Sequence, residues 1–136
     1  MELVYLWVEE YKNIKNQGFN FSPRFECEFK AEYYQKANSK GELEEKIHQK
    51  SSLSITPKMS ESLFPTNINI TTIVGKNGTG KSRVLKLLYG LYTAQLEKDV
   101  NSFAIFYDQE QKQHFYLGDK NKFHCFLKIL CFFFFF

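Results

Sequence analysis

Residues 75–82 read Gly-Lys-Asn-Gly-Thr-Gly-Lys-Ser and match the pattern G-x-x-x-x-G-K-[ST]. Glycine lets the backbone take turns that other residues disfavour, so several N–H groups of such a loop can reach the α- and β-phosphates of a nucleotide. Lys81 would bring a positive charge to the β- and γ-phosphates, and the hydroxyl of Ser82 would ligate Mg²⁺. The predicted cofactor-binding residues are Gly75, Asn77, Gly78, Thr79, Gly80, Lys81 and Ser82, with Lys81 as the catalytic residue. The pattern predicts a nucleoside triphosphate site, with ATP and Mg²⁺ as the expected cofactors.

A phosphate-binding loop of this kind needs a buried strand before it and a helix after it. Residues 68–74 are rich in β-branched side chains and end in the apolar pair Ile73-Val74, which predicts a strand that runs into the core. After the loop, helical spacing predicts a helix with one broad apolar face, formed by Val84, Leu85, Leu87, Leu88, Leu91, Tyr92, Gln95 and Leu96. The partial positive charge at the start of that helix would add to the anion site. This order favours a phosphate site over the alternative, a glycine-rich surface turn.

The chain ahead of the loop has the pattern of antiparallel strands. Residues 3–8 form an apolar run of strand length, and the polar residues 9–16 predict a bend or a half-exposed strand. From Phe25 to Phe29, apolar residues alternate with glutamates, which predicts strands that cover a core on one side only. Residues 35–62 are polar and are expected to be a variable surface excursion between two strands, with a short helix inside it. The weaker alternative for that excursion is a partner-binding insertion.

Two apolar runs after the helix, residues 103–108 and 113–117, flank a short polar stretch and predict a β-hairpin. The first run ends in Asp108, with Glu110 two places on, and so imitates the strand whose acid completes the Mg²⁺ site of a phosphate-loop enzyme. The hairpin explains the apolar residues of this segment without a metal. Asp108 is therefore only an alternative metal ligand.

Length and composition narrow the classes of protein. The chain has 136 residues and a net charge of +3, which predicts one domain and gives no support to a nucleic-acid interface. The three cysteines include no C-x-x-C pair and the three histidines lack ligand spacing, so no disulfide framework or zinc site is expected. With no secretory leader and no apolar stretch long enough to span a membrane, the expectation is a soluble, cytoplasmic protein.

The last residues, 123–136, are apolar and end in five phenylalanines, a pattern that fits neither a strand period nor a helix face. An exposed tail of this composition would be an aggregation hazard. Our hypothesis is that it is an out-of-frame or prematurely ended terminus, while residues 1–122 form the globular part.

Residues 6–16 and the loop form G-x-N-G-x-G-K-S, with Asn77 in the third position, together resemble the N-terminal part of ATPase heads of the SMC, RecF and overcoming-lysogenization-defect type, which are labelled AAA and share the ABC ATPase fold. The resemblance covers residues 3–117, although Glu10 stands where those proteins have asparagine. It implies an α/β phosphate-loop NTPase fold with an N-terminal antiparallel β subdomain, incomplete in this chain. It also implies that Lys12, in the first turn, approaches the nucleotide phosphates.

In such proteins two heads sandwich ATP as a homodimer, and their Q-loop, signature motif, Walker B acids and switch histidine lie beyond the part that this sequence matches. We therefore expect weak ATP binding and little or no hydrolysis by this chain alone. Two alternatives stay open. One is a truncated remnant without a stable function, and the other is a small kinase that uses Asp108, which antiparallel patterning before the loop disfavours.

Overall fold

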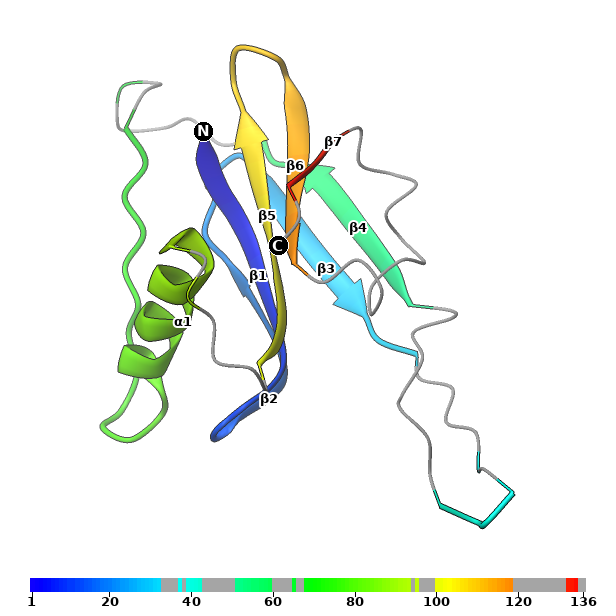
Figure 1. The fold of residues 1–136 in the computed structure, drawn as a ribbon. Helices are drawn as coiled ribbons and strands as arrows, with labels where there is room; N and C mark the ends of the chain where they lie inside the picture. The colour runs from blue at the N-terminus through cyan, green and yellow to red at the C-terminus, as the bar shows by residue number, and fades with distance from the viewer. Residues whose placement is uncertain are drawn as a thin grey trace.

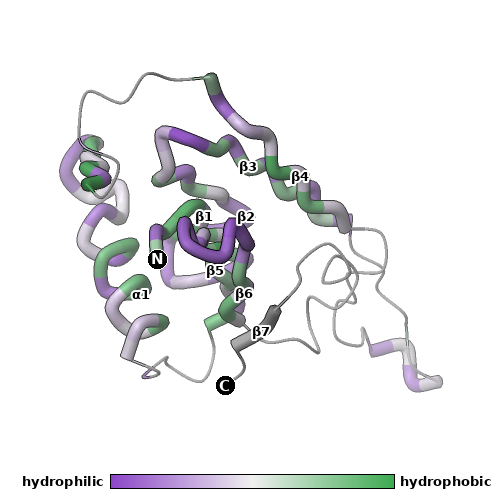
Figure 2. The backbone as a smooth tube through the Cα atoms, turned by 90° about the horizontal axis from the view of Figure 1, so that it is seen from above, coloured by the Kyte–Doolittle hydropathy of each residue, from purple (hydrophilic) through white to green (hydrophobic). Residues whose placement is uncertain are grey.

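The computed structural model describes residues 1–32, 37, 39–42, 51–59, 65, 68–93, 95, 100–118 and 132–134. Its elements are β1 (Glu2–Tyr11), β2 (Ile14–Asn20), β3 (Phe25–Lys30), β4 (Ser52–Pro57), α1 (Lys81–Thr93), β5 (Asn101–Asp108), β6 (Gln113–Gly118) and β7 (Phe132–Phe134). One sheet has the strand order β2-β1-β5-β6-β7, and β3 pairs with β4 in a second sheet (Figure 1). Seen from above, α1 and the β3–β4 pair lie on opposite sides of the larger sheet (Figure 2). Within the described residues, no helix has the length and apolar character needed to cross a membrane.

The larger sheet is covered on both faces. Toward β3 and β4, the rings of Trp7 and Phe103 pack edge-on against Phe29, with ring centres 4.9 and 5.1 Å apart. Toward α1, Leu6 and Val8 belong to a second buried cluster, which includes three residues of the helix. Two-sided burial explains the near-continuous apolar run of β1. The outer strand β3, in contrast, has one buried face and one charged face, as its alternation predicts.

Strands β5 and β6 form the hairpin predicted at residues 103–117. They pair in antiparallel register from Phe103↔Gly118 to Asp108↔Gln113. On its other edge β5 pairs antiparallel with β1, which places β5 in the interior of the sheet. The apolar residues of this segment are therefore explained by strand packing.

The prediction of a buried strand at residues 68–74 is wrong. This segment runs beside α1 (Figures 1 and 2), has no regular secondary structure, and exposes 60% of Ile70 and 82% of Val74. Two side chains hold it: the Asn69 amide donates to Glu2 (3.2 Å) and the Thr71 hydroxyl donates to the carbonyl of Phe21 (2.6 Å). A strand forms only where a neighbour accepts and donates its backbone hydrogen bonds, and no described strand pairs with this one.

The interpretation of residues 35–62 as an irregular excursion is wrong for Ser52–Pro57, which is β4. Leu53 and Ile55 of this segment alternate with serine and threonine, and the strand pairs antiparallel with β3 from Phe25↔Pro57 to Lys30↔Ser52. A proline at a strand end costs no essential ladder bond. The short helix expected within the excursion lies outside the described residues.

The terminal phenylalanines include a strand that their sequence pattern does not predict. Phe132–Phe134 is β7, and it pairs in parallel with β6 from Phe115↔Phe132 to Leu117↔Phe134. Backbone pairing does not require alternating side chains, and the free edge of β6 supplies the partner. The prediction that the tail fits no strand is therefore wrong for these three residues. Residues 123–131 and 135–136 lie outside the described residues.

Candidate phosphate-binding site

The predicted phosphate loop is a tight turn that leads directly into α1. Both Gly78 (φ 83°) and Gly80 (φ 103°) have positive φ, where glycine carries no steric penalty. The amide and the hydroxyl of Thr79 both donate to the carbonyl of Lys76, at 3.3 and 2.8 Å. Two of the glycines in the sequence motif, Gly78 and Gly80, thus lie where the backbone of the loop has a positive φ.

The side chain of Lys81 folds back over the loop. Its Nζ donates to the carbonyl oxygens of Gly75 (2.6 Å) and Lys76 (2.7 Å). Gly75 is required by close packing, because an added Cβ would lie 2.7 Å from Oγ1 of Thr79. The ammonium group and the start of the helix are thereby held at the same loop.

Several N–H groups of the loop have no acceptor within the part of the chain that the structure describes. Among the described residues, the amides of Gly78, Gly80, Lys81 and Ser82 donate to no backbone or side-chain oxygen. The first turn of α1 carries no acidic side chain, so its partial positive charge is not offset there. Unpaired amides, a helix start and an ammonium group together favour an anion such as a phosphate.

Helix α1 begins at Lys81, and its amides at Arg83 and Val84 donate to the carbonyl of Gly80, both at 3.0 Å. Its buried face is narrower than predicted. Leu87 and Leu91 are buried as expected, whereas side chains expected on the same face are 57% exposed for Leu85 and 81% exposed for Tyr92. The helix packs on the sheet by one stripe, which fixes the direction of the loop ahead of it.

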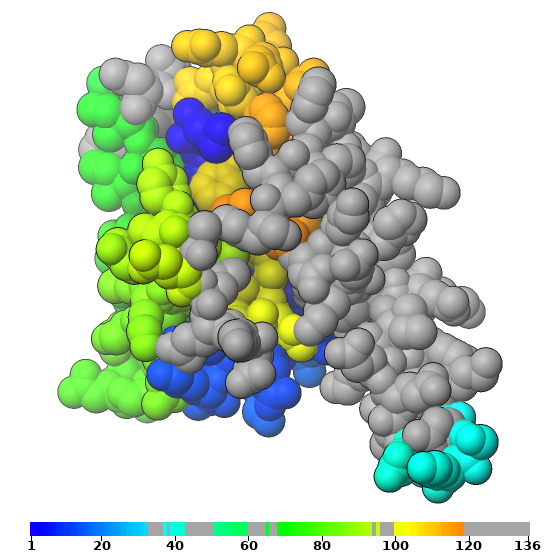
Figure 3. Space-filling view, in the orientation of Figure 1, coloured from blue at the N-terminus to red at the C-terminus, as the bar shows by residue number. Residues whose placement is uncertain are grey.

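The β1–β2 hairpin reaches the loop, as Figure 3 shows at the surface where these segments adjoin. Its tip holds Lys12, which has a φ of 56° and places its Nζ 5.3 Å from the ring centre of Tyr11. Lys12 thus lies in the turn that contacts the loop, but its ammonium group lies over the neighbouring ring. Asn13, the next residue, touches the loop, because its Nδ2 donates to the carbonyl of Gly78 at 3.3 Å. The sequence analysis missed Asn13, and its only signal is its position beside Lys12.

The metal part of the prediction depends on Ser82 alone. Ser82 lies exposed in the first turn of α1, as the motif requires. No group of three or more histidine, cysteine, aspartate or glutamate side chains comes together as a metal site among the described residues.

Asp108 lies at the opposite end of the sheet from the phosphate loop. Strand β5 has 8 residues, a span of roughly 23 Å, and its other end pairs with the hairpin end of β1. The Oδ1 atom of Asp108 accepts from the amides of Glu110 (2.8 Å) and Gln111 (3.2 Å) and so caps the β5–β6 turn. The structure does not bring Asp108 and Lys81 together.

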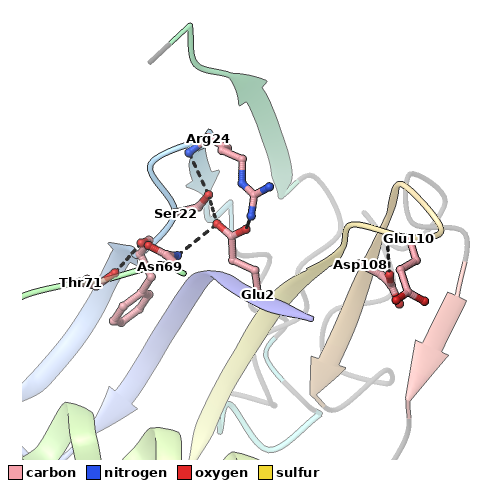
Figure 4. Close-up of polar contacts among 8 residues, drawn as sticks. Glu2, Ser22, Arg24, Asn69, Thr71, Asp108 and Glu110 are labelled. Carbon is pink, nitrogen blue, oxygen red and sulfur yellow. Dashed lines mark hydrogen bonds and ion pairs between the residues drawn. The ribbon is translucent and has the colours of Figure 1, made fainter. Parts of the chain in front are cut away.

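Near Asp108, a polar cluster surrounds the buried carboxylate of Glu2 (Figure 4). The Ser22 hydroxyl donates to it at 2.6 Å, and the guanidinium of Arg24 and the amide of Asn69 also donate to it. An open cavity of about 680 Å³, lined by Glu2, Phe21, Asn69, Thr71, Asp108 and Glu110, lies at this end of the molecule. The cluster anchors residues 68–74 to β1 and is separate from the phosphate loop.

Perturbed pKa values mark the packed interior. Burial is the main cause that raises the pKa of Cys27 to about 12 and that of Tyr5 to about 12. Burial also lowers the pKa of His114, which stacks edge-on against Phe25 with ring centres 4.7 Å apart. These shifts have a structural origin and do not identify a catalytic group.

The phosphate loop remains the feature of this chain that bears most directly on function. Comparisons with protein-family models, with curated proteins and with solved structures found no match.

Proposed function

We propose that this protein binds ATP, together with Mg²⁺, through residues 75–82, as the N-terminal part of an ATPase head of the ABC and SMC type. The observation that carries the proposal is the placement of Lys81 Nζ against the carbonyls of Gly75 and Lys76, at the start of a helix whose first amides have no acceptor among the described residues. A polyphosphate bound there would accept from the amides and lie beside the ammonium group. Lys81 would contact the β- and γ-phosphates, and Ser82 would ligate Mg²⁺.

The proposal is for binding with little or no turnover. Phosphoryl transfer depends on positioned charge and on a group that orients the attacking nucleophile. The acid that the kinase alternative requires, Asp108, caps a turn at the far end of β5, which argues against that alternative. The ATP-sandwiched homodimer that the resemblance implies and the cytoplasmic location that the composition predicts stay predictions.

Removal of the Lys81 charge tests the proposal. Mg-ATP affinity of the whole chain would be measured by isothermal titration calorimetry for wild type, Lys81→Ala and Lys76→Ala. The last variant is the matched control, since it removes the same charge from the same loop but not the ammonium group that folds over it. We expect Lys81→Ala to bind about ten-fold or more weakly, because a hydrogen bond to a charged group contributes roughly 1.5–3 kcal/mol. Equal affinities for wild type and Lys81→Ala would overturn the site.

The remnant alternative predicts no binding at all. A thermal-shift measurement with Mg-ATP separates the remnant alternative from the proposal. A ligand that binds only the folded state raises the midpoint temperature of unfolding by mass action. An unchanged midpoint at millimolar Mg-ATP would favour the remnant.

A further inference from the structure

Asn13 joins two parts of the phosphate site that are far apart in the sequence. Its Nδ2 donates to the carbonyl of Gly78, 65 residues away, at 3.3 Å. Its Oδ1 accepts from the guanidinium of Arg83, in the first turn of α1. One side chain of the β1–β2 hairpin therefore connects Gly78 of the loop with Arg83 at the start of the helix.

The packing around Asn13 holds the hairpin against the loop. A Cβ added at Gly80 would lie 3.3 Å from Cγ1 of Ile14 and 3.4 Å from Oδ1 of Asn13, so the hairpin rests on a glycine. Ile14 is only 3% exposed and belongs to the cluster that contains the buried face of α1. Lys12, which precedes Asn13 in the hairpin turn, has a φ of 56°. This conformation costs a residue with a side chain about 1–2 kcal/mol. Such local strain is retained where the surrounding contacts determine the conformation.

We propose that Asn13 is a positioning residue of the phosphate site, held by Arg83, that fixes the Gly78 carbonyl on the hairpin side of the loop. The inference rests on the proposed function. Gly78 has open space around it, since an added Cβ would meet no atom within 4 Å, and the Thr79 amide of the same peptide donates to Lys76 at 3.3 Å, within the loop. The bond from Asn13 adds a restraint from outside the loop and helps to keep the loop in one arrangement before a phosphate arrives. A preorganised loop loses less conformational freedom on binding.

The test measures Mg-ATP affinity for Asn13→Ala, Arg83→Ala and the double variant. We expect Asn13→Ala to bind roughly three- to ten-fold more weakly, the range that one neutral hydrogen bond represents. The same change in the Arg83→Ala background should have a much smaller effect, because Asn13 is no longer held. Lys15→Ala is the matched control: Lys15 lies in the same hairpin, and its Nζ pairs with Glu10 at 2.7 Å. It should leave the affinity unchanged.

A spectroscopic measurement separates positioning from general stability. In nucleotide-free protein, amide hydrogen exchange at Thr79, whose amide donates to the carbonyl of Lys76, should be faster in Asn13→Ala than in wild type, while exchange in β5 stays the same. If Asn13→Ala binds Mg-ATP as tightly as wild type while Lys81→Ala does not, the positioning role is overturned and the proposed function stands. If Lys81→Ala is also as tight as wild type, both proposals are overturned.

Discussion

A methyl group added at Gly80 tests whether the hairpin rests on the phosphate loop. At this position the new Cβ would meet Ile14 and Asn13 at 3.3 to 3.4 Å, with φ at 103°. Gly78 is the matched control, because it has a φ of 83° and open space around the added Cβ. For alanine the left-handed conformation costs about 1–2 kcal/mol, and the restricted unfolded chain returns about 0.4–1 kcal/mol. We therefore expect Gly78→Ala to lower the free energy of unfolding by about 1 kcal/mol.

Gly80→Ala should cost about 1 kcal/mol more than Gly78→Ala, because overpacking forces a buried neighbour, Ile14, to move. Urea unfolding measures both variants, followed by the fluorescence of Trp7, which is the single tryptophan and is 6% exposed. Gly80→Ala should also reduce Mg-ATP affinity by a larger factor than Gly78→Ala does, since the added Cβ displaces Asn13 from the loop. Equal unfolding free energies for the two variants would refute the close contact between hairpin and loop.

Two further predictions concern residues away from the loop. Asp108→Ala should lower the free energy of unfolding by about 1 kcal/mol through loss of the turn cap, and calorimetry should find its Mg-ATP affinity unchanged; a lost affinity would revive the kinase alternative. Because burial lowers the pKa of His114 in the folded state, the unfolded state binds the proton more tightly. The unfolding free energy of wild type relative to His114→Phe should thus be highest at pH values above the ordinary imidazole pKa. It should fall as the pH drops from that pKa toward the lower folded-state pKa. Urea unfolding at several pH values measures this difference. A difference that grows on acidification would contradict this.

The features that the sequence predicts correctly are local ones. The turns at Gly78 and Gly80, the helix that follows the loop and the β5–β6 hairpin each depend on neighbours close in the sequence. Residue type and spacing are therefore sufficient to indicate them.

The features that the sequence predicts wrongly, or misses, depend on distant partners. Residues 68–74 have strong strand propensity, yet a strand needs a neighbouring ladder, which spacing alone does not reveal. The strand β4 was missed because its alternation is short and polar, and its partner is β3. Asn13 meets Gly78 across 65 residues, a contact that only the fold brings about.

Local and distant contacts also differ in what they would contribute at this site: local bonds shape the loop that would bind phosphate, whereas hydrolysis would need groups from distant parts of the chain. The bonds that shape the loop, from Lys81 to Gly75 and Lys76 and from Thr79 to Lys76, all lie within residues 75–82. The long-range contacts of the loop come from the β1–β2 hairpin, where Asn13 and Ile14 hold the loop but add no acid or base. Under the proposed function, phosphate affinity would require little more than this segment and the hairpin, whereas hydrolysis would require groups placed by other parts of a sheet. We therefore expect this arrangement to bind a polyphosphate and, by itself, not to cleave it.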